Sequence, residues 1–244
     1  MSEGRFSSDV IAGLTAGALV SPIVSAVDRA LAENASGKCP LWQSFGNSLK
    51  EMARHPVKFI KSPQFYYIWL VYGGTYVAAN MAETVSRAKG IDPALPKWAS
   101  SFVVNTSTCI VKDRAFAKLF GTSAAKAVPA ASYAAWLTRD VVSMAVFFTL
   151  PPIVGKQIAE YTGNEKNGYY AAQIVLPLAL QTVTTPIHLL GYDIYNNPNN
   201  SWAQRVAFLK KDYLKNVSIR MLRQAPPWSF GTIGNREIRA YLNQ

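Results

Sequence analysis

The chain has 244 residues, of which 50% are apolar, 12% aromatic and only 16% charged. An ordinary soluble domain carries roughly 25% charged residues, so this composition excludes a disordered tail and a water-exposed helical bundle. The 25 Lys and Arg residues outnumber the 14 Asp and Glu residues and give a net charge of +11, which indicates an anionic neighbour such as lipid, nucleic acid or an acidic metabolite.

Six long uncharged segments predict membrane-spanning helices. In chain order they cover residues 10–27, 62–82, 98–111, 141–155, 167–192 and 224–235. Three of them reach the roughly 18 residues that cross a bilayer unaided, and the others need a flanking charge at the interface or a place in the bundle interior. Within the first segment, Gly13 and Gly17 form a GxxxG step, which permits two helix backbones to approach closely.

The basic residues gather in three of the connections between these segments. Residues 28–62, 112–140 and 193–223 together hold 17 of the 25 Lys and Arg residues but only seven of the 14 acidic residues. With six spans and both termini on one side, these three loops share the other side. The imbalance favours the six-span layout and predicts that the basic loops face the inner, negatively charged side, against anionic lipid head groups.

Similar residues recur at a nearly constant spacing along the chain. Pro22 and Pro186 lie 164 residues apart, and Trp42 and Trp202 lie 160 residues apart. A middle copy fits halfway, at Asp113. This pattern predicts three repeats of two spans each. Their predicted bounds are residues 1–90, 91–166 and 167–244.

A threefold repeat of two spans, with a proline in the odd helices and an amphipathic segment on the basic side, resembles the mitochondrial carrier family. The odd-helix signature of that family is PX[DE]XX[KR]XR. Here it is matched in part, by Pro22, Arg29, Lys112, Arg114 and Pro186, whereas the acidic positions hold Val24, Cys109 and His188. The segment from Arg139 to Phe148 is similar to the start of the fourth carrier helix, and the segment from Arg220 to Pro226 is similar to part of the sixth.

The resemblance implies an all-α membrane protein whose six transmembrane helices form three two-helix repeats with pseudo-threefold symmetry. It also implies a multi-pass protein of the mitochondrial inner membrane, with its termini on the intermembrane-space side and cardiolipin bound at the basic loops. Amphipathic surface helices are expected over residues 42–54 and 202–213. The stretch from Arg114 to Ala130 is too short for the usual loop helix, so we expect that helix to be absent from the middle repeat.

Mapping the carrier contact positions onto this chain gives a set of candidate substrate-binding residues. They are Ile60, Lys61, Arg139, Asp140 and Arg223. An arginine inside a membrane protein is costly unless it meets an anion or an acid, so Arg139 and Arg223 indicate an anionic ligand or a structural ion pair. The alternative is that both arginines lie at the membrane boundary and simply extend to the head groups.

The same resemblance nominates gate residues, which in carriers form a ring of ion pairs between repeats. They are Pro22, Asp28, Arg29, Lys112, Asp113, Arg114, Pro186, His188 and Asp193. Because the three acidic signature positions are lost, the usual ring cannot form. Either the neighbouring aspartates and arginines replace it, or the protein no longer cycles. His188 is either proton-sensitive or a packed neutral histidine.

Two functions from different classes follow. The first is transport of a small anionic metabolite or nucleotide by alternating access. The second is a carrier-fold scaffold or insertase within a larger mitochondrial membrane complex. A soluble nucleic-acid binder is disfavoured because the basic residues alternate with uncharged segments. No enzyme motif is visible, and two Cys and two His residues are too few for a disulfide framework or a local zinc site, so neither a metal nor a cofactor is expected. The first residues lack a basic presequence, so any targeting signal is expected to be internal.

Overall fold

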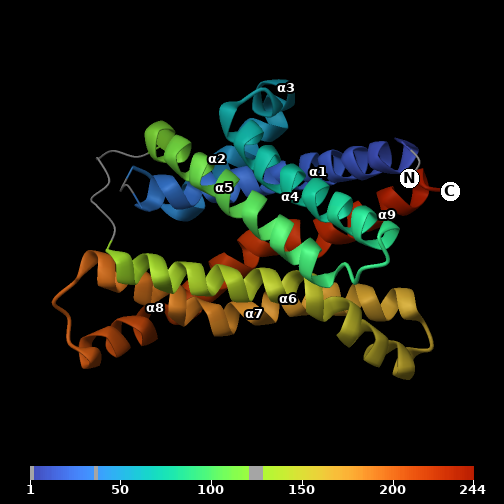
Figure 1. Ribbon diagram of the computed structural model, residues 1–244. Coiled ribbons are helices and arrows are strands. Elements are labelled where there is room, and N and C mark those ends of the chain that lie inside the picture. The colour runs from blue at the N-terminus through green and yellow to red at the C-terminus, as the bar shows by residue number, and fades with distance from the viewer. Residues whose placement is uncertain (1–2, 36–37, 121–128) are drawn as a thin grey trace. The chain divides into compact units, whose positions relative to one another are not determined.

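The computed structural model describes residues 3–35, 38–120 and 129–244, and every regular element within these ranges is a helix (Figure 1). The all-α class predicted from the sequence is therefore confirmed. The chain forms two compact units, one of residues 1–124 with 230–244 and one of residues 125–229. The predicted repeat boundaries stay a prediction, because one compact unit can hold more than one repeat.

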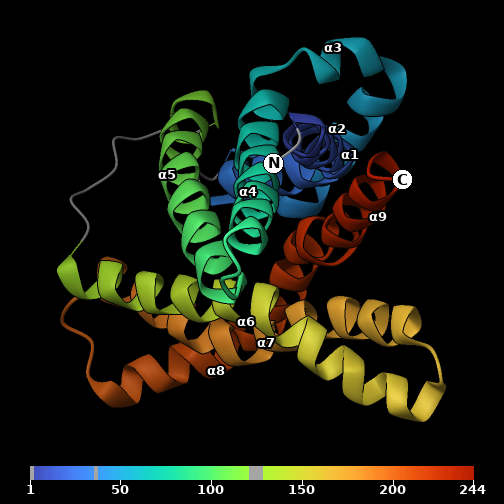
Figure 2. The same cartoon turned by 45° about the vertical axis from the view of Figure 1, so that its right-hand side comes forward.

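The first unit is built around three long helices and the shorter helix α9. They are α1 (Glu3–Ala35), α4 (Pro63–Ala88), α5 (Ala94–Phe120) and α9 (Thr232–Leu242). Helix α1 packs against α4 and α9, and α4 packs against α5 (Figure 2). The short helices α2 (Leu41–Arg54) and α3 (Pro56–Ile60) connect α1 to α4. Helix α4 begins after Ser62, whose hydroxyl accepts from the backbone N–H of Phe65 at 3.4 Å.

Helices α1 and α4 approach closely at the predicted GxxxG step. A Cβ atom built on Gly17 would lie only 2.6 Å from Cα of Gly73, and one built on Gly13 would lie 2.7 Å from the backbone nitrogen of Val77. The indole N–H of Trp69 donates to the carbonyl of Leu14 at 2.8 Å and crosses the same contact. The small residues of this step are therefore required by packing.

The predicted amphipathic segment over residues 42–54 is a helix, α2, and it turns small polar residues toward the protein. Ser44 and Ser48 are buried, and Ser44 donates to the Glu33 carboxylate of α1 at 2.6 Å. Trp42 is 65% exposed on the outside. This orientation agrees with a lipid-facing helix, although contact with lipid itself stays a prediction. The second predicted segment, 202–213, is also helical and forms the first half of α8 (Trp202–Gln224).

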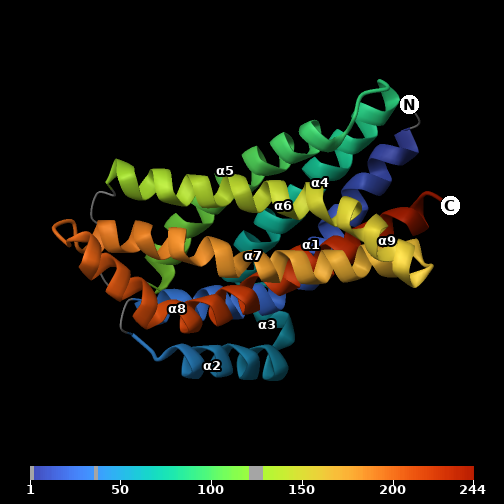
Figure 3. The same ribbon diagram turned by 90° about the horizontal axis from the view of Figure 1, so that it is seen from below.

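The second unit is a helical hairpin covered by α8. It contains α6 (Ala130–Thr162), α7 (Glu165–Asn196), α8 and the first five residues of the π-helical segment η1 (Ala225–Gly231). Helices α6 and α7 run side by side (Figure 3). Gly163 ends α6 at φ +67°, and Asn164 caps α7 by accepting from the backbone N–H of Asn167 at 3.0 Å.

The wide turn η1 follows from its two prolines. Pro226 and Pro227 offer no backbone N–H, so the regular α-helical ladder cannot continue through them. The carbonyl of Trp228 accepts from the side chain of Gln173 at 2.6 Å, and the Trp228 ring stacks on Phe147 at 4.7 Å, so side-chain contacts hold this turn. The predicted sixth span, 224–235, corresponds to η1 and the start of α9.

Among the described residues, three helices are long and apolar enough to cross a membrane, and they cover residues 5–34, 130–162 and 165–195. They contain the predicted segments 10–27, 141–155 and 167–192. The predicted segments 62–82 and 98–111 are helical within α4 and α5. In the middle repeat, α5 continues to Phe120, and residues 121–128 of the expected short loop lie outside the described residues.

Candidate functional site

The second unit gathers basic side chains between α6, α7 and α8. Arg139 of α6 forms an ion pair with the neighbouring Asp140 at 2.6 Å, and its Nη1 also donates to Nδ1 of His188 on α7. Because arginine can only donate, Nδ1 of His188 is the acceptor and carries no proton. Two predicted substrate residues and one predicted gate residue therefore lie together.

Arg220 of α8 belongs to the same cluster and is only 9% exposed. Its Nη2 donates to Oε1 of Gln181 at 3.0 Å and reaches Oγ1 of Thr184 at 3.5 Å. Burial and the positive charges of Arg139 and Arg223 lower the pKa of Arg220 to about 9. In the part of the chain that the structure describes, Nε of Arg220 is buried without a hydrogen-bond partner.

The α7 side of this cluster is a polar stripe on one helix face. Gln181, Thr184, Thr185 and His188 follow at a spacing of three and four residues, and the first three are fully buried. A spacing of this kind places side chains one above another on a helix. The amide of Gln181 is held by donating Nε2 to the carbonyl of Pro177 at 2.9 Å, which leaves Oε1 directed at the arginine of α8.

The proline that the sequence nominates in α7 opens the helix beside this stripe. Pro186 has no backbone N–H, so the carbonyl of Thr182 lacks its usual partner in the helix. The hydroxyl of Tyr213 on α8 donates to this carbonyl at 2.9 Å. The proline therefore also creates an attachment point for α8.

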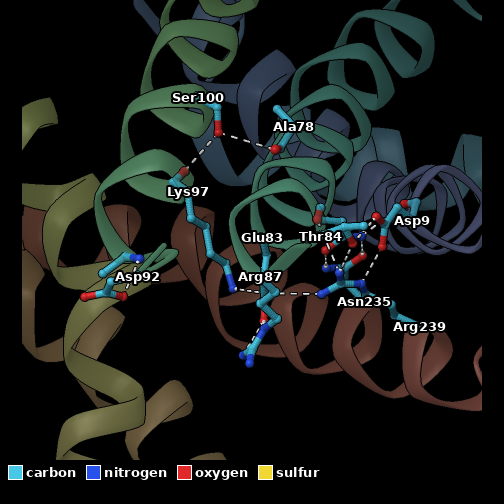
Figure 4. A network of polar contacts seen from close by, with 12 residues as sticks. Asp9, Ala78, Glu83, Thr84, Arg87, Asp92, Lys97, Ser100, Asn235 and Arg239 are labelled. Atoms are coloured by element: carbon cyan, nitrogen blue, oxygen red, sulfur yellow. Dashed lines mark hydrogen bonds and ion pairs between the residues drawn. The ribbon is translucent and has the colours of Figure 1, made fainter. Parts of the chain in front are cut away.

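The first unit contains a separate polar network where α1, α4 and α9 meet (Figure 4). Arg239 of α9 donates Nε to Asp9 of α1 at 2.5 Å and Nη2 to the hydroxyl of Thr84 at 2.7 Å. Thr84 in turn donates to Asp9 at 2.6 Å. Asp9 is 1% exposed, so its charge is neutralised by an arginine that lies 230 residues away in the sequence.

Glu83 of α4 extends this network to α5. It accepts from Lys97 at 2.8 Å, from Arg87 at 2.9 Å and from Arg239 at 3.1 Å. Burial alone would raise the pKa of Glu83, but the nearby charges of Lys97 and Arg239 and the hydrogen bonds lower it to about 2. Beside it, the amides of Asn80 and Asn235 donate to each other at 2.8 Å. Every donor named here has an acceptor within the unit, so the network suits fastening helices better than holding a ligand.

Two predicted gate residues form a buried ion pair between α1 and α5. Lys112 donates to Asp28 at 2.8 Å, and the two side chains are only 6% and 5% exposed. Lys112 also contacts Asp113 at 2.8 Å, whose side chain is 69% exposed. Arg29 pairs with Glu33 of its own helix at 3.0 Å and with Glu51 of α2 at 2.9 Å.

The third predicted aspartate, Asp193, closes the corner between α7 and α8. It is fully buried and accepts from Arg205 at 2.5 Å and from the amide of Asn200 at 2.9 Å. The same arginine donates to the carbonyl of Pro198 at 3.0 Å. Asp28 and Asp193, which the sequence places at matching points of the first and third repeats, therefore each have a buried cation from a following helix.

The remaining candidates lie apart from these contacts. Ile60 is 49% exposed at the end of α3, and Lys61 follows it at an exposed position. Pro22 lies inside α1, and Arg114 is exposed on α5. The described residues include no group of His, Cys, Asp and Glu side chains that could hold a metal ion.

Sequence reasoning missed several residues of both clusters. The sequence places Arg220 in the third basic loop and in the segment similar to the sixth carrier helix but does not single it out as a site residue, although its spacing of three from Arg223 places both on one helix face. The stripe that begins at Gln181 could have been found from its helical spacing. The pairing of Asp9 with Arg239 has no local signal, because the two residues come from opposite ends of the chain.

Comparison with known proteins identifies the family. The family model described as a probable citrulline exporter matches residues 12–243, so the chain belongs to this family. No curated protein and no solved structure matches the chain. The family is one of membrane transporters rather than enzymes, which agrees with the absence of an enzyme motif from the sequence and with transport as the general function.

The assignment to the mitochondrial carrier family is wrong, because the family that matches nearly the whole chain is a different one and no carrier family matches. The physical reason is that prolines, small residues and paired charges inside apolar helices serve any multi-pass transporter. The most specific part of the carrier signature is its acidic positions, and here they hold Val24, Cys109 and His188, which do not match it. The substrate and gate roles that were mapped from carriers remain predictions without that support.

Proposed function

We propose that this chain exports citrulline, or a closely related small amino acid, across a membrane. The family match over residues 12–243 carries the proposal. Arg139 of the second unit supports it, because this arginine lies on α6, which is long and apolar enough to cross a membrane, and charged groups on such helices are costly in lipid and mark substrate paths. The expected solute therefore changes from an anionic metabolite to a neutral amino acid. Citrulline still offers one anionic group, its carboxylate.

Transport by alternating access requires contacts that break and re-form between two states. The buried pairs Asp28–Lys112 and Asp193–Arg205 are the candidates within their respective units. Asp28 and Lys112 join helices of the first and second predicted repeats, and Asp193 and Arg205 join α7 to α8 within the third, so a ligand that changes the helix packing would change both pairs. Six spanning helices in three repeats remain the layout that we propose for this movement.

The environment of the protein is proposed only in general terms. The mitochondrial inner membrane and the side of the termini were implied by the carrier resemblance and have lost that basis. The basic loops still favour the negatively charged side of a membrane and contact with anionic lipid, of which cardiolipin is one example. A scaffold that has lost transport was the alternative, and the family description favours transport over it.

The proposal is tested by counterflow in vesicles. The purified full chain is reconstituted into liposomes that contain unlabelled L-citrulline, and entry of labelled L-citrulline is followed over time. We expect entry above that of protein-free vesicles, and competition by citrulline but not by inorganic phosphate or nucleotides. A folded protein that gives no entry of citrulline would refute the proposal, and competition by nucleotides would point to a different solute.

A further inference from the structure

Arg220 is a buried charge whose hydrogen bonds among the described residues go only to uncharged groups. Its Nη2 donates to Oε1 of Gln181 at 3.0 Å and reaches Oγ1 of Thr184 at 3.5 Å. No carboxylate pairs with Arg220 among the described residues. Its Nε has no acceptor there either. A guanidinium in this position lacks the anion that normally accompanies a buried arginine.

The surroundings of Arg220 increase the need for an anion. Arg139 and Arg223 are close enough to act on Arg220 electrostatically, and both add positive charge, whereas the carboxylate of Asp140 opposes them in part. Asp140 already pairs with Arg139 at 2.6 Å. On the α7 side, His188 accepts from Arg139 and therefore supplies no negative charge.

The neutral groups around Arg220 also hold it in one orientation. Gln181 is fixed by its bond to the carbonyl of Pro177, and the hydroxyl of Thr184 donates to the carbonyl of Leu180 at 3.1 Å. Both side chains are fully buried. An arginine that is held rigidly with free donor capacity can bind a planar carboxylate by parallel hydrogen bonds.

We infer that the guanidinium of Arg220 binds the carboxylate group of the transported amino acid. This inference rests on the proposed function and names the chemical group that the second unit recognises. Citrulline carries one carboxylate, so the arginine gains an anion when substrate binds and loses it on release. Gln181 and Thr184 position the arginine.

The test measures thermal unfolding of the purified full chain in mild detergent. We compare L-citrulline with citrullinamide, in which an amide replaces the carboxylate. A ligand at about 100 times its Kd should raise the Tm of the wild type by about 5 to 10 °C. Citrullinamide should give no rise.

Three variants separate binding from folding. Arg220→Gln should lose the citrulline-dependent rise, while its Tm without ligand stays equal to or above that of the wild type, because a buried unpaired charge is removed. Gln181→Glu should also lose the rise, because a carboxylate of the protein then occupies the arginine. The matched control is Lys215→Gln, which removes an exposed charge from the same helix and should behave as the wild type.

The outcomes distinguish this inference from the proposed function. If Arg220→Gln keeps the full response to citrulline, the inference is overturned while export can still stand. If citrulline has no effect but another amino acid stabilises the wild type, and not Arg220→Gln, then carboxylate binding holds and the citrulline assignment fails. If no carboxylate compound changes the Tm of the wild type, the inference is overturned. A Tm of unliganded Arg220→Gln well below that of the wild type would show a structural role and would also overturn it.

Discussion

The buried pair between Asp28 and Lys112 allows the sharpest prediction about stability. Lys112→Met removes the ammonium group that pairs at 2.8 Å with the Asp28 carboxylate, whose side chain is 5% exposed. Removing one partner of a buried pair costs about 3–5 kcal/mol, because the other charge stays desolvated. Asp28→Asn should cost less, since Lys112 keeps the 2.8 Å contact to Asp113 at the surface.

The double variant Asp28→Asn/Lys112→Met should be much closer to the wild type than Lys112→Met alone. It leaves no unpaired charge at this position, and such replacements are often close to neutral. The contact between Lys112 and Asp113 changes the order of stability of these variants little, because an exposed ion pair contributes about 0–1 kcal/mol.

The measurement is thermal unfolding in detergent of the wild type, the two single variants and the double variant. For a chain of this length, the cost for Lys112→Met corresponds to a fall in Tm of about 6 to 20 °C. A smaller fall should be seen for Asp28→Asn, and a recovery for the double variant. Equal, additive losses in the two single variants would refute the reasoning, because independent effects would show that the two charges do not interact.

Three further predictions concern packing, pH and a helix attachment. Gly17→Ala should lower the free energy of unfolding by about 1–3 kcal/mol, because its Cβ would meet the α4 backbone at 2.6 Å. Gly46→Ala has open space around it and should raise the free energy of unfolding by about 0.5–1 kcal/mol. Equal Tm values for the two variants in a melting experiment would contradict this. The pKa of Glu83 is lowered from 4.5 to about 2, so its contribution of about 3 kcal/mol is present above pH 4.5 and is lost as the pH falls toward 2. Acid titration of stability should therefore show a weaker pH dependence in Glu83→Gln, and an unchanged slope would argue against the network. Tyr213→Phe should lose about 0.5–1.5 kcal/mol by leaving the carbonyl of Thr182 without its donor, and an unchanged Tm would contradict this role.

The spanning helices and the close helix contact could be predicted because their signals are local. An uncharged run such as residues 10–27 needs no knowledge of its partner to be recognised as a helix inside a membrane. Gly13 and Gly17 lie four residues apart and therefore share one helix face. The structure adds only which helix they meet, which is α4.

The sites could be predicted less well because their partners are chosen by tertiary structure. Arg139 was recognised as an unusual charge, but its contact with His188 joins two helices. Arg220 differs from neighbouring loop charges only by being buried, and burial is not visible in residue type. The acidic positions of the carrier signature are the part of that motif that can be tested in the sequence, and they do not fit. The family match corrects the assignment to the carrier family.

Release of labelled L-citrulline from preloaded vesicles tests the central claim most directly. Vesicles that contain the wild type, Arg220→Gln or Lys215→Gln at equal protein density are diluted, and the label that remains inside is counted over time. We predict rapid release with the wild type and with Lys215→Gln, and release at the protein-free rate with Arg220→Gln. Release by the wild type no faster than from protein-free vesicles would contradict citrulline export, and unchanged release by Arg220→Gln would contradict the assigned site.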